Sequence, residues 1–307
     1  MKTKFLYLFL FVWSFTNGQS KVISEEILIK NDSIELPGTL TFTDTKTPLV
    51  IWVHGSGNVD RNGNQAGVNI KANYIKQFRD EVNKENIAFF SFDKRTATKR
   101  NIAFSKDITF DAFIEDLNIV INHFKNDNRF SKIILVGHSQ GSLIAMLASK
   151  NAAKYISIAG PSTSIDKTII QQITAQSPEF GKIAEAHFKE LVETGDIKQV
   201  NPLLVSVFAK QNFAFLISWA KYNPSEEIKK LKIPVLIING TKDLQVKIED
   251  ANALHKANPT SELVIIENMN HVLKNIEKDA DNMSSYYSPD FEILKKVVTT
   301  IVAFIKK

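Results

Sequence analysis

The amino-acid sequence predicts an α/β fold with a mostly parallel, eight-stranded sheet that is flanked by helices and carries an inserted helical cap. Short apolar runs alternate with helical periodicity, which is typical of a parallel sheet covered on both faces. No internal repeat, low-complexity tract or long Pro/Gly linker interrupts this alternation. The six central strands are expected at Pro48–Val53, Ile87–Phe92, Lys132–Val136, Tyr155–Ile158, Ile233–Ile238 and Glu262–Ile266.

Two further strands precede these six and bring the total to eight. Ile23–Ile29 and Gly38–Phe42 are apolar segments with a less regular alternation of polar and apolar residues. Their closeness in the sequence favours an antiparallel hairpin that leads into the sheet.

Helical periodicity is clearest just before the third central strand. Apolar residues recur there at spacings of three and four, which places them on one helix face. These residues are Phe110, Phe113, Ile114, Leu117, Ile121 and Phe124. A second helix is expected after Ser139, and a last one from about Phe291 to Ile305.

One long segment, residues 162–230, breaks the alternation. It contains no convincing strand and reads as several helices, interrupted near Ser177-Pro178, Gly195 and Asn201-Pro202. We interpret it as a helical cap inserted into a core made of residues 19–161 and 231–307. Three aromatic residues of the segment are expected to share a helix face, where they either pack inside the cap or also line a substrate pocket: Phe208, Phe215 and Trp219.

The N-terminus has the order of a secretory signal peptide. Lys2 and Lys4 precede an apolar run over Phe5–Phe15, and small and polar residues follow up to Gly18. The run is too short to span a bilayer, so we expect residues 1–18 to be cleaved and the protein to be exported, to the periplasm or beyond the cell. An uncleaved anchor is the alternative reading.

Composition narrows the possible functions further. The chain of 307 residues has a net charge of +5, and loss of residues 1–18 would lower it to +3 by removing two lysines. So small and dispersed an excess gives no reason to expect nucleic-acid binding. The sequence contains no cysteine, which excludes disulfides, thiol nucleophiles and cysteine metal sites, and which suits an oxidising compartment. We expect no stable membrane insertion after cleavage; the oligomeric state is left open.

A candidate nucleophile follows the strand Lys132–Val136. Residues Gly137–Gly141 read Gly-His-Ser-Gln-Gly, and a helical pattern comes next. A G-x-S-x-G sequence between a strand and a helix is the nucleophile elbow, a sharp turn in which side chains at the glycines would crowd neighbouring backbone. Ser139 is therefore the predicted nucleophile.

A serine hydroxyl needs a base to take its proton. Of the six histidines, only His271 lies in a loop just after the final predicted strand, which puts it at the same edge of the sheet as Ser139. The others are expected in an early turn, next to the serine, or on helices: His54, His138, His123, His187 and His255.

The base in turn needs a carboxylate to hold its tautomer. Asp243 follows the strand Ile233–Ile238 in a loop at that same edge, so it is the preferred candidate; a turn or helix-capping role is the alternative. Glu249 and Asp250 are rivals that we expect on the next helix. The order Ser139, Asp243, His271 is the order found in α/β-hydrolases.

Two backbone N–H groups are needed to receive the developing oxyanion. One is expected from Gln140, directly after the nucleophile. The other is expected from Ser56 in the glycine-containing loop His54–Gly57, with the N–H of Gly55 or Gly57 as alternatives; a glycine-rich turn without a catalytic role would have the same sequence. The charged clusters Asp60-Arg61 and Asp93-Lys94-Arg95 are expected to form ion pairs, with support of the oxyanion loop or contact with a substrate carboxylate as alternatives.

Together these segments resemble bacterial α/β-hydrolase carboxylesterases with an H-G-S-G-x-x-D-R loop, in the superfamily that includes serine-aminopeptidase-like and dienelactone-hydrolase-like proteins. The resemblance extends over the chain from residue 19 to the C-terminal tail. The matching segments are His54-Gly-Ser-Gly-Asn-Val-Asp-Arg61, Phe92-Asp-Lys-Arg95, Gly137-His-Ser-Gln-Gly141, Gly240-Thr-Lys-Asp243 and Asn270-His-Val-Leu-Lys274.

The resemblance implies a triad of Ser139, Asp243 and His271 that cleaves small carboxylic esters with short to medium acyl chains, without metal or organic cofactor. Because this fold hosts many reactions, a peptidase, thioesterase or acyltransferase on the same triad stays open. A polysaccharide acetyl esterase and a non-catalytic binding module are the remaining alternatives.

Overall fold

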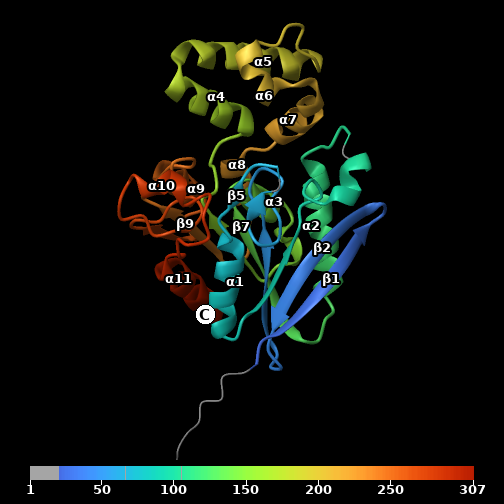
Figure 1. The fold of residues 1–307 in the computed structure, drawn as a ribbon, viewed down its shortest axis with the longest axis vertical. Helices are drawn as coiled ribbons and strands as arrows, with labels where there is room; N and C mark the ends of the chain where they lie inside the picture. The colour runs from blue at the N-terminus through green and yellow to red at the C-terminus, as the bar shows by residue number, and fades with distance from the viewer. Residues whose placement is uncertain (1–20, 66, 105) are drawn as a thin grey trace, which may run out of the picture.

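The structure is a computed structural model that describes residues 21–65, 67–104 and 106–307 (Figure 1). The predicted signal peptide lies outside the described residues. Eight strands form the main sheet: β1 (Ile23–Asn31), β2 (Ile34–Phe42), β3 (Thr47–Val53), β6 (Ala88–Phe92), β7 (Phe130–His138), β8 (Lys154–Ile158), β9 (Val235–Gly240) and β10 (Glu262–Ile266). Two short strands that the sequence did not predict, β4 (Asn64–Gln65) and β5 (Ile70–Lys71), pair with each other.

The strand order of the main sheet is β1-β2-β6-β3-β7-β8-β9-β10. β1 and β2 are antiparallel, and β2 runs antiparallel to β6, whereas the pairs from β6 to β10 are parallel. This confirms the mostly parallel eight-stranded sheet and its leading hairpin. β9 begins at Val235, two residues later than predicted, since Pro234 has no N–H to donate to a neighbouring strand.

Helices cover both faces of the sheet. α1 (Tyr74–Lys84) and α11 (Lys295–Lys306) pack on one face, and α2 (Asp111–Phe124), α3 (Gln140–Leu147) and α9 (Ile248–Ala257) pack on the other. Successive residues of β3 point to opposite faces, as the twofold period of a strand requires, and are buried in the two different apolar clusters. The central strands are therefore apolar on both sides, which explains why they read as continuous runs.

The last helix begins at Lys295, four residues later than expected. The residues before it are held against the loop that follows β10, where Leu294 N donates to Leu273 O at 2.8 Å. Ile293 also forms an isolated bridge with Lys274. These contacts keep the backbone extended, so the helix cannot begin at Phe291. A short helix, α10 (Asp281–Ser284), lies earlier in the same segment.

Between β8 and β9 the chain forms only helices and turns. The helices are α4 (Ile165–Gln176), α5 (Pro178–Thr194), α6 (Val205–Phe208), α7 (Phe213–Ala220) and α8 (Pro224–Ile228). Figure 1 shows α4 to α7 as a separate lobe above the sheet, with α8 against the body of the protein. The lobe has its own apolar cluster of buried residues: Ala184, Phe188, Leu191, Ile197, Leu204, Phe208, Phe213 and Leu216.

The expected shared helix face of three aromatics is wrong. Phe208 ends α6, while Phe215 and Trp219 lie on α7. The helix stops because Ala209 is extended, with φ −62° and ψ 141°, and because the Asn212 side chain bonds Val207 O at 2.9 Å. That amide satisfies a carbonyl that a continuing helix would have used.

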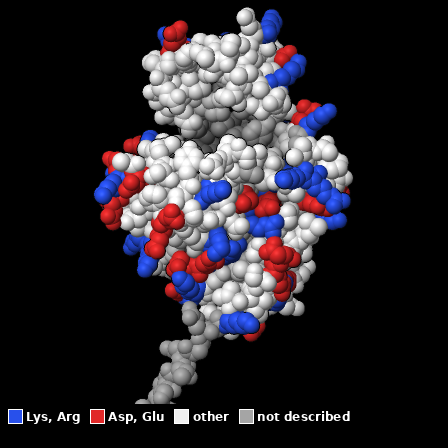
Figure 2. Space-filling model, in the orientation of Figure 1, with Lys and Arg blue, Asp and Glu red and all other residues white. Residues whose placement is uncertain are grey.

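One stretch of the described chain, Pro202–Ile228, is apolar and long enough to cross a membrane by length and composition alone. In the structure this stretch is broken into short helices, and part of its apolar surface packs in the cap lobe. Figure 2 shows that the visible face of the lobe has few charged side chains, whereas those of both signs cover the body below it.

Candidate active site

Ser139 occupies a strained turn between β7 and α3. Its backbone has φ 54° and ψ −121°, a conformation that L-residues rarely adopt. The turn is held by a bond from Ser139 N to Ile158 O at 2.9 Å. Strain of this kind costs about 1–3 kcal/mol and persists only where the surroundings impose it. The side chain is thereby raised at the edge where the parallel strands end.

The two glycines of the elbow are required by close backbone contacts. A Cβ on Gly137 would lie 2.4 Å from Gly141 O, and a Cβ on Gly141 would lie 2.2 Å from Val53 O. Both are backbone atoms that cannot rotate away. The G-x-S-x-G spacing thus lets α3 begin directly against β3 and β7.

His271 and Asp243 are in direct contact. His271 Nδ1 lies 2.8 Å from Asp243 Oδ2, and both residues are buried. Asp243 Oδ1 accepts hydrogen bonds from Gln245 N at 2.8 Å and Val246 N at 3.0 Å. With its other oxygen occupied by backbone, the carboxylate is oriented toward the imidazole.

The same contacts set the ionisation of Asp243. Burial alone would raise the pKa of this carboxyl, but the neighbouring His271 and the two backbone N–H groups outweigh burial and hold the pKa below its usual value. Asp243 is therefore an anion at neutral pH. An anion at Nδ1 favours the tautomer of His271 in which Nε2 is free to accept a proton.

His138, next to the serine, supports the backbone of His271. Its Nε2 lies 2.7 Å from His271 O, and since a carbonyl can only accept, this nitrogen carries the proton. Burial, assisted by the nearby His271, lowers the pKa of His138 to about 3, so the ring is neutral. The ring stacks on Trp52, at 6.0 Å between centroids, and lies 4.7 Å from the His271 ring.

The loop that carries His271 is braced by Asn270. Its side-chain oxygen accepts from Val272 N at 3.2 Å and Lys274 N at 2.9 Å, and its amide nitrogen donates to Ser285 Oγ at 2.8 Å. The side-chain pattern of the sequence gave no hint of this role.

Among the described residues the Ser139 hydroxyl makes no hydrogen bond with His271. Hydrogen bonds between a nucleophile and its base are often long without substrate and tighten in the reacting complex.

The loop His54–Gly57 lies against the elbow. A Cβ on Gly55 would be 3.2 Å from both Ser139 Cβ and His138 Nδ1. Ser56 and Gln140 both line one cavity of 710 Å³. The two predicted oxyanion donors, separated by more than eighty residues in sequence, therefore border the same space.

A buried lysine connects these two segments. Lys94 Nζ donates to Gly55 O at 2.9 Å and to Gln140 Oε1 at 2.8 Å, and it lies 4.6 Å from the centre of the Phe113 ring. Only 6% of Lys94 is exposed, and burial lowers its pKa to about 7. From the sequence, Lys94 was one member of a charged cluster; its partners are visible only in the folded chain.

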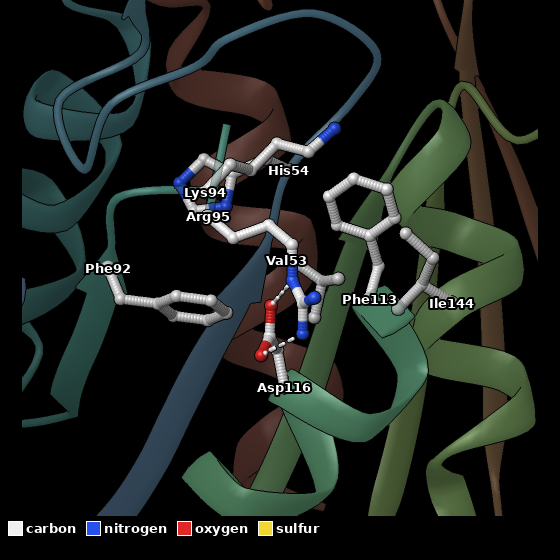
Figure 3. Close-up of a pocket in the computed structure, with 8 residues that line it drawn as sticks. All are labelled: Val53, His54, Phe92, Lys94, Arg95, Phe113, Asp116 and Ile144. Atoms are coloured by element: carbon white, nitrogen blue, oxygen red, sulfur yellow. Dashed lines mark hydrogen bonds and ion pairs between the residues drawn. The ribbon is translucent and has the colours of Figure 1, made fainter. Parts of the chain in front are cut away.

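Arg61, Asp93 and Arg95 form ion pairs, as expected, whereas Asp60 forms none within the described chain: its Oδ1 accepts from Asn62 N at 2.8 Å and Asn64 N at 2.9 Å. Arg61 binds Asp93 through Nε at 2.9 Å. Arg95 binds Asp116 through two bonds of 2.7 Å, drawn as dashed lines in Figure 3. The first pair joins the segment after the loop His54–Gly57 to the residue before Lys94, and the second joins the residue after Lys94 to α2.

The cavity of 710 Å³ lies between the cap and the core. Phe215 and Trp219 line it, together with Phe113 and Ile108 from the core. Phe208 does not line the cavity: it is fully buried in the apolar cluster of the lobe, because it belongs to a different helix from the other two aromatics.

In the described chain, no group of three His, Asp or Glu side chains is arranged to hold a metal ion.

The remaining candidates lie elsewhere or have other partners. Asp250 is on α9, as expected, and accepts from Ser162 N at 2.9 Å and Ser162 Oγ at 2.7 Å. His54 is buried beside Phe92, and burial lowers its pKa to about 3. His187 in the cap accepts from Asn201 N.

A family model described as BD-FAE matches residues 39–257 of the chain. Among curated proteins, Esterase EstD of Thermotoga maritima is 22% identical over 285 residues, which cover 89% of this chain and 66% of that esterase. The chain thus spans slightly less than two thirds of the length of this relative.

Solved structures with the same fold include two esterases. Est1E from Butyrivibrio proteoclasticus, with ferulic acid bound, matches this chain with a TM-score of 0.58 and 19% sequence identity. The match covers 92% of this chain and 100% of the Est1E chain. The Pyrococcus furiosus esterase Pf2001 matches with a TM-score of 0.58 and 17% sequence identity. The match covers 97% of this chain and 95% of the Pf2001 chain.

Proposed function

This chain is a member of the BD-FAE family with an α/β-hydrolase fold, and from that premise we propose that it cleaves carboxylic esters through an acyl-enzyme on Ser139. One observation carries the proposal: a buried, anionic Asp243 holds His271 at 2.8 Å, and the His271 ring lies 4.7 Å from that of His138, the neighbour of Ser139 in a strained elbow. This combination of base, orienting carboxylate and presented hydroxyl is what acyl transfer by a serine needs.

The reaction would proceed in two steps. His271 takes the proton of Ser139 while the serine oxygen attacks the ester carbonyl. The N–H groups of Gln140 and Ser56 receive the oxyanion, and His271 returns the proton to the leaving alcohol as the carbon–oxygen bond breaks. Water then attacks the acyl-enzyme by the same route and releases the acid and free Ser139.

The cavity supports a substrate whose acyl or alcohol part is largely apolar. Its walls carry Phe215 and Trp219 from the cap and Phe113 from the core. We propose short to medium acyl chains as the first class to test. The ferulic acid bound to Est1E makes an aromatic acyl group a second class worth including.

A fluorophosphonate probe and a panel of p-nitrophenyl esters test this proposal. The wild-type protein should take the label and cleave the esters, whereas Ser139→Ala and His271→Ala should each lower kcat by several orders of magnitude. Aminoacyl anilides, acyl thioesters and an acceptor alcohol added to the ester separate a peptidase, thioesterase or acyltransferase from an esterase. Absence of both labelling and turnover in the wild-type protein would favour a binding module.

We also propose that the protein is exported, on the strength of the basic and apolar segment at its N-terminus. Expression of the full chain in a bacterium, followed by fractionation and N-terminal sequencing, should recover a periplasmic or secreted protein cut near residue 18. A cytoplasmic protein that retains Met1 would contradict this.

A further inference from the structure

The carbonyl that Lys94 binds belongs to the peptide unit of the proposed oxyanion donor. Gly55 C=O and Ser56 N–H are part of one planar group, and the described chain has no cis peptide bond. In a trans peptide these two groups point in opposite directions. A bond that holds Gly55 O at 2.9 Å therefore fixes the direction of the Ser56 N–H.

The second bond of Lys94 reaches the other donor residue. Gln140 begins α3, and its side-chain oxygen accepts from the same nitrogen at 2.8 Å. Gln140 is 3% exposed, so water competes little for this bond. One nitrogen atom thus joins the loop after β3 to the first residue of the helix after the elbow.

We propose that Lys94 is the positioning residue of the oxyanion hole, tying the Ser56 and Gln140 donors into one rigid unit. This inference rests on the proposed acyl-transfer function and extends it. A donor must lie within about 3 Å of the developing oxyanion and be fixed beforehand to lower the barrier. Lys94 meets this need through its bonds to Gly55 O and Gln140 Oε1. Because Lys94 also lines the cavity that Ser56 and Gln140 border, the experiment must separate this role from a contact with substrate.

The bond from Gln140 also explains why a glutamine follows the nucleophile. A backbone N–H is available from any residue at this position, so the donor role alone does not select a side chain. An amide oxygen facing the buried Lys94 nitrogen does, because that nitrogen would otherwise have only the Gly55 carbonyl as an acceptor for its N–H groups. A leucine of similar size would fill the space and lose the bond.

The test compares Lys94→Met with Lys154→Met. Lys154 is a matched control: its Nζ donates to Phe304 O at 2.6 Å and lies 4.9 Å from the Phe304 ring, but it stands at the start of β8, on the opposite edge of the sheet. Kinetics on neutral p-nitrophenyl esters, inhibition by an alkyl boronic acid and binding of the product acid are measured for both.

Lys94→Met should lower kcat/KM about 10- to 100-fold through kcat. The Ser56 and Gln140 N–H groups would still be present, but as mobile donors they would stabilise the oxyanion less than fixed donors do. Boronate affinity should fall by the same factor, since the boronate adduct mimics the tetrahedral state, while product-acid binding stays within about twofold. Lys154→Met should leave all three values near those of the wild type.

Gln140→Leu and Gln140→Glu provide an independent pair should Lys94→Met fold poorly. The leucine variant should lose activity in kcat, and the glutamate variant, which keeps an acceptor for Lys94, should recover most of it. Wild-type kcat/KM in Lys94→Met, or in Gln140→Leu, would overturn the inference. So would a loss confined to esters that carry a carboxylate, which would make Lys94 a substrate-binding group. If Ser139→Ala keeps full activity, the proposed function itself fails, whatever Lys94 does.

Discussion

Replacement of Asp243 by asparagine tests the link between the buried carboxylate and the base. Asparagine would keep an oxygen for the N–H groups of Gln245 and Val246, now bonded at 2.8 and 3.0 Å. Its NH₂ group would then face His271 Nδ1. The imidazole would have to place its proton on Nε2, where it could no longer accept the proton of Ser139.

The magnitude follows from the 2.8 Å separation of His271 Nδ1 and Asp243 Oδ2. With an effective dielectric constant of about 20, the attraction between carboxylate and imidazolium at this distance is about 6 kcal/mol. Loss of that attraction in the transition state corresponds to a fall in kcat of about 10⁴-fold.

Initial rates with a p-nitrophenyl ester, together with circular dichroism to show that the variant is folded, measure this effect. Asp250→Asn is the matched control, because Asp250 is a nearby carboxylate that bonds Ser162 instead. It should change kcat less than about threefold. A folded Asp243→Asn variant with kcat within tenfold of the wild type would refute the assignment, as would an equal loss in Asp250→Asn.

Three further outcomes are expected. Gly141→Ala should lower Tm by several degrees and abolish fluorophosphonate labelling, because its Cβ would lie 2.2 Å from Val53 O; a stable and active variant would contradict the account of the elbow. Phe215→Ala should raise KM for bulky esters with a small change in Tm, whereas Phe208→Ala should cost about 3–5 kcal/mol of stability with KM unchanged; the reverse pattern would place the pocket elsewhere. Burial lowers the pKa of Lys94 to about 7, whereas an unfolded lysine has a pKa of about 10.4, so between these two values the unfolded chain binds one more proton than the folded chain. The free energy of unfolding of the wild type, minus that of Lys94→Met, should therefore rise with pH across this window, by at most about 1.4 kcal/mol per pH unit. Urea titrations at several pH values measure this difference, and a constant difference would exclude the lowered pKa.

Periodicity was enough to predict the main sheet. Apolar runs such as Lys132–Val136 are buried on both faces, so their signal is strong and their order along the chain follows the βα alternation. Boundaries were less accurate where a single contact decides them, as at Pro234 and Leu294. The two-residue strands β4 and β5 could not be predicted, because two residues carry no period.

The cap shows where helical patterns mislead. Phe208, Phe215 and Trp219 lie close enough in sequence to suggest one face of one helix. Whether a helix continues through Ala209 depends on the Asn212 side chain, which bonds Val207 O in competition with the helix. That competition is local, but its outcome sends Phe208 into the lobe and Phe215 to the cavity.

The sequence by itself determined the sheet, the elbow around Ser139 and the candidates Asp243 and His271, because each depends on short-range spacing and on the rule that parallel strands end at one edge. Tertiary structure alone decided that His271 and Asp243 are in contact, that His138 and Asn270 brace the base, and that Lys94 joins Gly55 to Gln140. These contacts join residues far apart in the chain, and a hydrogen bond between two such groups depends on packing that leaves no periodic trace in the sequence.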